Sequence, residues 1–173
     1  LEIDGEIATL TLSNPGKLNA INLGMWLQLA NHVAVLSADN GIRCIVLRGA
    51  GSEAFAAGGD LEEFVTGRAT LEQALHYHDQ VAAALSAIAN CPHPTVALIQ
   101  GACIGGGLEI AGVCDLRICN ESARFGAPIN KLGFSIYPGE MDGLLKLAGA
   151  AVMKEILLEG RILTATEAYE KGL

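Results

Sequence analysis

The segment Gly105–Glu109 begins with three consecutive glycines and ends with a carboxylate, that of Glu109. The apolar, β-branched run Thr95–Ile99 predicts a buried strand upstream, and the pattern from Leu108 to Ala111 predicts the start of a helix. A glycine turn that opens a helix leaves backbone N–H groups unpaired at the positive end of the helix dipole, where they can hold an anion or a developing oxyanion. The segment therefore indicates a site that stabilises negative charge, with the Glu109 carboxylate beside it.

A second glycine turn, Gly58–Gly59, precedes Asp60, which we expect to cap the next helix. We expect the strand 42–47 to lead to this turn. One N–H from each turn would make a two-point oxyanion hole, although either turn alone is also explained by tight packing of a helix on a strand. The sequence contains no G-x-G-x-x-G, no G-x-x-x-x-G-K-[ST] and no G-x-S-x-G, which disfavours a phosphate loop and a serine nucleophile.

Two longer stretches that contain these turns resemble the signatures of one family. FAAGGDL (55–61) and GACIGGGLEIAGVCDLRI (101–118) resemble the two motifs of the crotonase (enoyl-CoA hydratase/isomerase) superfamily, and NPGKLNAINLGM (14–25) resembles its approach to the first helix. The resemblance runs from about residue 7 to residue 173. It implies an α/β fold of the ClpP/crotonase type, a superhelix of β-β-α units. We expect residues 1–173 to form a single crotonase-like core domain without the family's C-terminal trimerisation helices.

The resemblance also implies an activity and a set of site residues. It implies an acyl-CoA enzyme that stabilises an enolate, with the N–H groups of Gly59 and Gly106 as the oxyanion donors. Glu109 matches a glutamate that handles the added water in family hydratases. The motif positions that bind substrate fall on Ala57, Gly59, Asp60 and Gly106, although we expect the Asp60 side chain to serve mainly as a helix cap. Neither a metal nor a cofactor is implied, because acyl-CoA is itself the substrate.

The chain departs from the hydratase pattern at one position. The second hydratase glutamate should follow Pro128, where this chain has Ile129, and an aliphatic side chain cannot transfer a proton. Glu140, in a loop rich in glycine and proline, is the candidate replacement, and Tyr137 is a candidate hydrogen-bond donor.

Three interpretations therefore stay open. The first is hydration or isomerisation of an enoyl thioester. The second is decarboxylation, C–C hydrolysis or dehalogenation with the same oxyanion hole, and the third is a non-catalytic acyl-thioester-binding protein. The acyl carrier is either CoA or a protein-bound pantetheine. Lys17 is a candidate contact for a CoA phosphate, and a solvated surface lysine is the alternative.

The histidines and cysteines do not indicate a metal centre. His76 and His78 lie two positions apart in a predicted helix and so point to different faces, which favours solvent-facing or packing roles. The cysteines contain no CxxC pair, and we expect them to be reduced, mostly buried thiols of an intracellular, cytoplasmic protein. They are Cys44, Cys91, Cys103, Cys114 and Cys119.

Composition limits the possible partners. The chain has 173 residues, of which 51% are hydrophobic and 17% charged, enough for one domain with a substantial core. A net charge of −8 disfavours nucleic acid. No apolar run reaches the roughly 20 residues that a membrane span requires. The resemblance implies a homo-oligomer, either a trimer or a hexamer.

Alternating strands and helices must position the glycine turns. A strand, a helix capped by Asn22 and the strand 42–47 predict a parallel pair with a right-handed crossover. Capping boxes beginning at Thr70 and Thr164 predict two later helices. The remaining predicted elements are strands at 1–3, 7–12, 115–119 and 123–126, and helices at 143–148 and 152–158.

Overall fold

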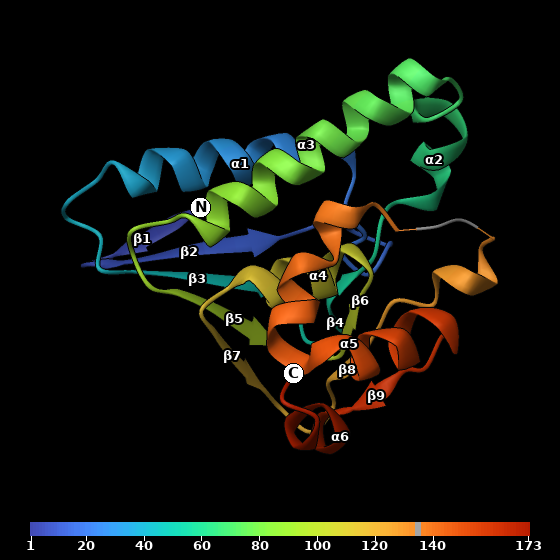
Figure 1. Cartoon of the computed structure of the whole chain (residues 1–173). Helices are drawn as coiled ribbons and strands as arrows, with labels where there is room; N and C mark the ends of the chain where they lie inside the picture. The colour runs from blue at the N-terminus through green and yellow to red at the C-terminus, as the bar shows by residue number, and fades with distance from the viewer. Residues whose placement is uncertain (134–135) are drawn as a thin grey trace.

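The computed structural model describes residues 1–133 and 136–173, which fold into two sheets with helices packed on them (Figure 1). Within these residues the first sheet has the strand order β1-β2-β3-β5-β7 and the second the order β4-β6-β8-β9. The first sheet contains β1 (Glu2–Asp4), β2 (Ile7–Leu12), β3 (Cys44–Gly49), β5 (Thr95–Ile99) and β7 (Leu116–Cys119). The second contains β4 (Ala54–Ala57), β6 (Ala102–Ile104), β8 (Arg124–Gly126) and β9 (Leu163–Thr164).

A β-β-α unit repeats along the chain. Strands β3, β5 and β7 lie in the first sheet, and each is followed by a strand of the second sheet: β4, β6 and β8. After β4 come α2 (Leu61–Gly67) and α3 (Leu71–Ala89), and after β6 comes α4 (Gly106–Val113). The expected crotonase-type architecture is therefore confirmed. The parallel pairing of β2 with β3 also confirms the parallel pair predicted from the sequence.

Three strands of the second sheet, β4, β6 and β9, were not predicted. Strands β4 and β6 are four and three residues long, and both lead directly into glycine turns. Strand β9 has only two residues. Such short segments carry no readable alternation of apolar and polar residues. The Gly58–Gly59 turn therefore follows β4, and not the strand at 42–47 as we expected.

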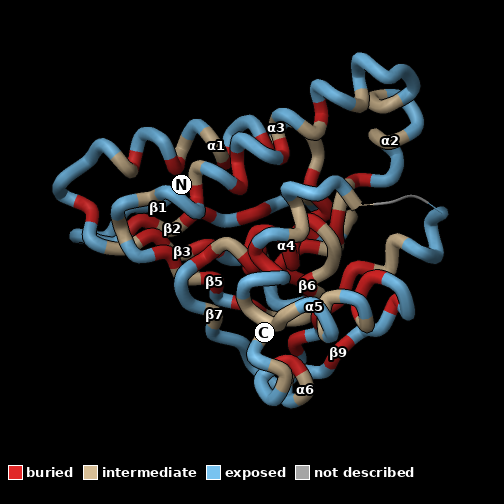
Figure 2. Tube along the Cα trace, viewed as in Figure 1, coloured by how far each residue is buried: buried red, intermediate tan, exposed pale blue. Residues whose placement is uncertain are grey.

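The first sheet is covered by α1 (Leu23–Ser37) and α3, which pack against each other. Asn22 caps α1, where its side chain accepts a hydrogen bond from the Met25 amide at 2.9 Å. The capping box at Thr70 opens α3, and the one at Thr164 opens α6 (Ala165–Glu170). Figure 2 shows the buried residues of α1 and α3 recurring at helical intervals. On α1 these are Trp26, Leu29, Val33 and Leu36.

The helices predicted at 143–148 and 152–158 form one kinked helix, α5 (Asp142–Leu158). The break lies at Gly149, whose φ of 75° is outside the helical region. The loop rich in glycine and proline, predicted at 133–143, contains the 3₁₀ helix η2 (Pro138–Glu140), and its residues 134–135 lie outside the described part of the chain. Another 3₁₀ helix, η1 (Ile129–Lys131), lies just before this loop. No helix among the described residues is both long and apolar enough to cross a membrane.

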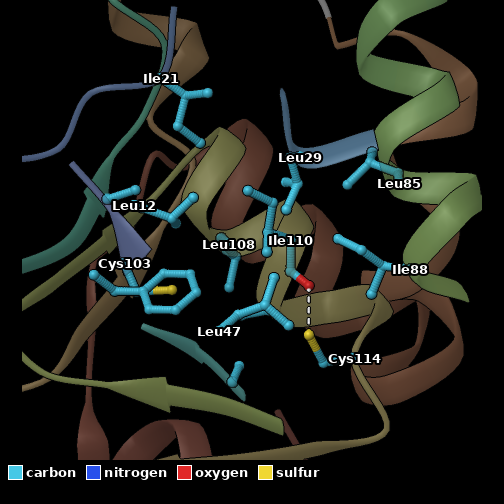
Figure 3. Close-up of a cluster of buried hydrophobic side chains, with 14 of the residues drawn as sticks. Leu12, Ile21, Leu29, Leu47, Leu85, Ile88, Cys103, Leu108, Ile110 and Cys114 are labelled. Atoms are coloured by element: carbon cyan, nitrogen blue, oxygen red, sulfur yellow. Dashed lines mark hydrogen bonds between the residues drawn. The ribbon is translucent and has the colours of Figure 1, made fainter. Parts of the chain in front are cut away.

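Buried side chains from both sheets and from α4 form a continuous core (Figure 3). Cys103 and Cys114 belong to it, and the Cys114 thiol contacts the Ile110 carbonyl oxygen at 3.3 Å. The other thiols differ from expectation: Cys44 and Cys91 are half-buried and Cys119 is exposed. Cys119 ends β7, the edge strand of its sheet, and so lacks a neighbouring strand to cover it.

Candidate active site

One cavity of about 350 Å³ contains most of the residues that the sequence analysis singled out. Both glycine turns border it, together with α3 and the segment around η1 and η2. The predicted site residues that line it are Ala57, Gly59, Gly106, Glu109 and Glu140.

The Gly58–Gly59 turn is shaped by hydrogen bonds to the segment before α1. Gly58 has a φ of 97°, which favours glycine, and its carbonyl oxygen accepts a hydrogen bond from the Ile21 amide at 2.7 Å. The Asp60 amide donates to the Ile21 carbonyl oxygen at 2.9 Å. Between these two bonds, the Gly59 amide donates to no backbone acceptor among the described residues.

The second turn, Gly105–Gly107, repeats this arrangement at the start of α4. Gly105 has a φ of 49°, and its amide donates to the Gly126 carbonyl oxygen at 2.9 Å. Gly106 is the first residue of α4, and its amide has no backbone acceptor in the described part of the chain. That amide lies at the positive end of the helix dipole.

Strand pairing brings the two turns together. Parallel β4 and β6 align Ala57 with Ile104, so the residues that follow each strand lie side by side. The approach is close, because a Cβ built on Gly105 would lie 3.4 Å from the Gly58 Cα atom. A Cβ on Gly107 would lie only 2.6 Å from the carbonyl oxygen of Ala56. The glycines thus permit both the turns and their contact.

Glu109 is buried on α4, one turn from Gly105, whose carbonyl oxygen accepts the Glu109 amide at 2.9 Å. Its pKa is raised well above the usual value of 4.5, first because burial penalises the charged form and second because of the Glu140 carboxylate. The nearby Arg68 guanidinium acts in the opposite direction. A carboxyl group with a raised pKa is suited to accept and return a proton near neutral pH.

Glu140 reaches the cavity from η2 and is held by two partners. One carboxylate oxygen lies 3.0 Å from His78 Nδ1, and the other accepts a hydrogen bond from the Tyr137 amide at 3.3 Å. The His78 and Tyr137 rings stack with their centres 4.7 Å apart. Tyr137 thus holds Glu140 through its backbone amide, and its ring stacks on His78, whereas the sequence analysis considered its side chain as a hydrogen-bond donor.

His78 is the residue of this group that the sequence analysis missed. We assigned both histidines of α3 to solvent or packing, but His78 pairs with Glu140 while His76 is exposed. The signal was present in the helical spacing. His78 lies three residues before Val81 and seven before Leu85, so it falls next to Tyr77 at the edge of the buried stripe of α3.

Ile129 lines the same cavity from η1. The position that the resemblance gives to a second carboxylate therefore contributes an alkyl side chain. The second carboxylate of the cavity is Glu140, which lies eleven positions further along the chain.

Asp60 and Lys17 lie outside the residues that line the cavity. The Asp60 side chain caps α2 by accepting a hydrogen bond from the Glu62 amide, which confirms the expected cap. Its pKa is lowered, chiefly by the hydrogen bond from Lys17. The Lys17 ammonium contacts Asp60 at 2.8 Å and Glu62 at 2.7 Å. The geometry therefore gives both residues a structural role and offers no support for their expected substrate contacts.

The comparisons with known proteins show the family of the chain. The family model described as "Enoyl-CoA hydratase/isomerase" matches residues 2–173. The chain belongs to the enoyl-CoA hydratase/isomerase family. This confirms the resemblance seen in the sequence motifs.

Three members of the enoyl-CoA hydratase/isomerase family show how much of a relative's length the chain covers. It is 39% identical to "Probable enoyl-CoA hydratase 2, mitochondrial" of Arabidopsis thaliana, over 98% of this chain and 56% of the relative. It is 30% identical to a Delta(3,5)-Delta(2,4)-dienoyl-CoA isomerase of Dictyostelium discoideum, over 96% and 60%. A crystal structure of an enoyl-CoA hydratase/carnithine racemase from Magnetospirillum magneticum superposes with a TM-score of 0.95 at 47% identity, over 98% and 64%. The chain thus spans less than two thirds of the length of these relatives.

Proposed function

We propose that this chain is the catalytic core of an acyl-CoA enzyme that stabilises a thioester enolate. The amides of Gly59 and Gly106 would both donate to the thioester oxygen as it gains negative charge. One such donor contributes about 3 kcal/mol to transition-state stabilisation in other enzymes. The proposal is supported by the alignment of the two turns and by the lack of a backbone acceptor for either amide among the described residues.

The observation that carries the proposal is that Glu109 and Glu140 line the same cavity as these amides. In a 3-enoyl thioester, one carboxylate would take a proton from C2, and the electron pair would move onto the thioester oxygen. Return of a proton at C4 would then give the 2-enoyl thioester. This double-bond isomerisation needs proton transfer at two carbons and consumes no water.

Hydration of a 2-enoyl thioester is the second candidate. It is favoured by the name of the Arabidopsis relative, a probable enoyl-CoA hydratase. In the family's hydratases two glutamates handle the water, and here the second of these positions is Ile129, whose alkyl side chain lines the cavity. Isomerisation tolerates this substitution better, because the base does not have to orient a water molecule.

One assay separates these possibilities. The protein is incubated with a short 3-enoyl-CoA and, separately, with crotonyl-CoA, and the absorbance of the conjugated enoyl thioester is followed. Isomerisation increases the absorbance in the first reaction, whereas hydration decreases it in the second. Binding of both thioesters without either change would contradict the proposed reaction and leave the other two interpretations, a different reaction in the same oxyanion hole or a non-catalytic protein.

A further inference from the structure

Arg68 occupies an unusual position beside the cavity. Its guanidinium carbon lies 3.6 Å from the centre of the Phe64 ring and 3.3 Å from the centre of the Tyr77 ring. Arg68 lines the cavity that contains Glu109, and its buried Nε atom has no hydrogen-bond partner among the described residues. Aromatic faces stabilise the positive charge, but they do not satisfy the in-plane N–H donors of a guanidinium.

Arg117 shows how this chain satisfies an arginine elsewhere. Its guanidinium donates to four backbone carbonyl oxygens, including that of Cys114 at 2.7 Å. Arg161, near the C-terminus, pairs with two glutamates. Arg68, in contrast, forms no ion pair with any carboxylate of the described residues. An arginine beside a cavity with an unmet buried donor is poised for a ligand that supplies the missing acceptors.

The two carboxylates of the cavity are not suitable partners for Arg68. Glu140 already interacts with His78 and with the Tyr137 amide. Glu109 forms no ion pair with Arg68 among the described residues, and burial raises the pKa of its carboxyl group. Arg68 therefore has no ion-pair partner among the described residues, and its buried Nε donor stays unmet beside the space that the acyl group would occupy.

The aromatic pair around Arg68 adjoins the Gly59 turn. A Cβ built on Gly59 would lie 2.8 Å from the Phe64 ring and 3.8 Å from the Tyr77 hydroxyl oxygen. A thioester oxygen held at the Gly59 amide would thus place a short acyl chain in the same cavity as the guanidinium. The volume of about 350 Å³ suits a short chain.

We infer that Arg68 is a specificity-determining residue and that the substrate is a short acyl thioester with a carboxylate at the far end of its acyl chain. The inference rests on the proposed function, since it assumes that the cavity takes an acyl thioester. A terminal carboxylate matches the planar fork of a guanidinium with two parallel hydrogen bonds. A terminal methyl group or amide would leave the positive charge of Arg68 unpaired.

The test compares two enoyl thioesters of equal length, one ending in a carboxylate and the other in the isosteric primary amide. We expect the protein to favour the carboxylate by at least about tenfold in kcat/KM, which corresponds to about 1.4 kcal/mol. In Arg68→Gln we expect this ratio to fall toward one. The ratio is the readout, because general damage to the cavity lowers both values. Arg43→Gln removes one positive charge from an exposed arginine ahead of β3 and serves as the matched control.

Binding of saturated analogues of the two thioesters tests the inference separately from the proposed function. Their dissociation constants do not depend on any chemical step. A protein that turns over neither enoyl thioester but binds the saturated carboxylate more tightly, through Arg68, would contradict the proposed reaction and support the inference. Equal affinities for the carboxylate and the amide, or a preference that survives in Arg68→Gln, would overturn the inference.

Discussion

Two walls of the cavity are held in place by different kinds of contact. The first, the glycine-turn wall, consists of the Gly58–Gly59 and Gly105–Gly107 turns and is positioned by strand pairing and backbone hydrogen bonds. The second, the loop wall, consists of residues 137–140 and is connected to α3 through the contacts of His78 with Glu140 and Tyr137. Backbone amides in the first wall have no rotamers to lose, whereas the second wall depends on a few side-chain contacts.

This difference divides the chemistry between the walls. Stabilising an oxyanion requires donors that are already in place, because reorganisation during the reaction would cost free energy. Proton transfer instead requires a carboxyl group of suitable pKa within reach of the substrate. Glu109 meets both requirements. It is a buried carboxyl group, and α4 holds it in a fixed position next to the glycine-turn wall. Glu140 provides the second carboxyl group from the less constrained side.

The largest effect is expected when the carboxyl group of the rigid wall is removed. We predict that Glu109→Gln lowers kcat by about 10²- to 10⁴-fold, the usual contribution of a general acid–base group. Affinity for an unreactive acyl-CoA should change little, because glutamine keeps the shape and polarity of the side chain. Steady-state rates and ligand titration measure the two quantities. Activity that survives this substitution would remove Glu109 from the mechanism.

Glu109→Gln should lower activity but raise stability relative to the wild type at higher pH, and this gain in stability checks that the variant folds. In the folded protein the pKa of Glu109 lies above its ordinary value of 4.5, so the folded state binds more protons than the unfolded state between these two values. The free energy of unfolding of the wild type therefore falls as the pH rises through this window. Glutamine has no proton to lose. Thermal melts should thus show Glu109→Gln becoming more stable relative to the wild type as the pH increases.

Alanine substitutions compare the rigidity of the two walls directly. A Cβ at Gly107 would lie 2.6 Å from the Ala56 carbonyl oxygen and 3.0 Å from the Ala56 Cβ, whereas a Cβ at Gly139 would meet no atom within 4 Å. We predict that Gly107→Ala lowers the free energy of unfolding by about 1–3 kcal/mol, the usual cost of overpacking. Gly139→Ala should stay within about 0.5 kcal/mol of the wild type. Equal denaturation midpoints for the two variants would show that the glycine-turn wall is not tightly packed.

A smaller loss of activity is expected from the carboxyl group of the loop wall. We predict that Glu140→Gln slows turnover at least about tenfold, an effect of about 1.4 kcal/mol on the barrier. Glutamine can still accept a hydrogen bond from the Tyr137 amide, so the loop should keep its position. The rate with the preferred enoyl thioester is the measurement, and an unchanged rate would exclude Glu140 as a proton-transfer group.

The same contrast explains which parts of the site the sequence revealed. The glycine-turn wall depends on residues close together in sequence, so Gly59, Gly106 and Glu109 were readable as motifs. The helix caps at Asn22, Thr70 and Thr164 were predictable for the same reason, since each involves residues three positions apart.

Features that depend on distant residues were harder to predict. Strands β4 and β6 are short, and the parallel pairing that stabilises them joins segments about 48 residues apart. The contact between His78 and Glu140 spans 62 residues, and nothing in either local sequence indicates the other. Arg68 was missed because its surroundings, the Phe64 and Tyr77 rings, come from α2 and α3 on either side of it.

The smallest effect is expected from His78, which acts on the reaction only through Glu140 and is therefore a positioning residue. His76 lies on the same helix but is exposed, which makes His76→Gln the matched control for His78→Gln. Losing one hydrogen bond to a side chain costs about 1 kcal/mol, so we predict that His78→Gln lowers kcat roughly fivefold with little change in KM. The loss of kcat should therefore appear in His78→Gln and not in His76→Gln. If both variants keep the kcat of the wild type, His78 only supports the packing of the loop wall.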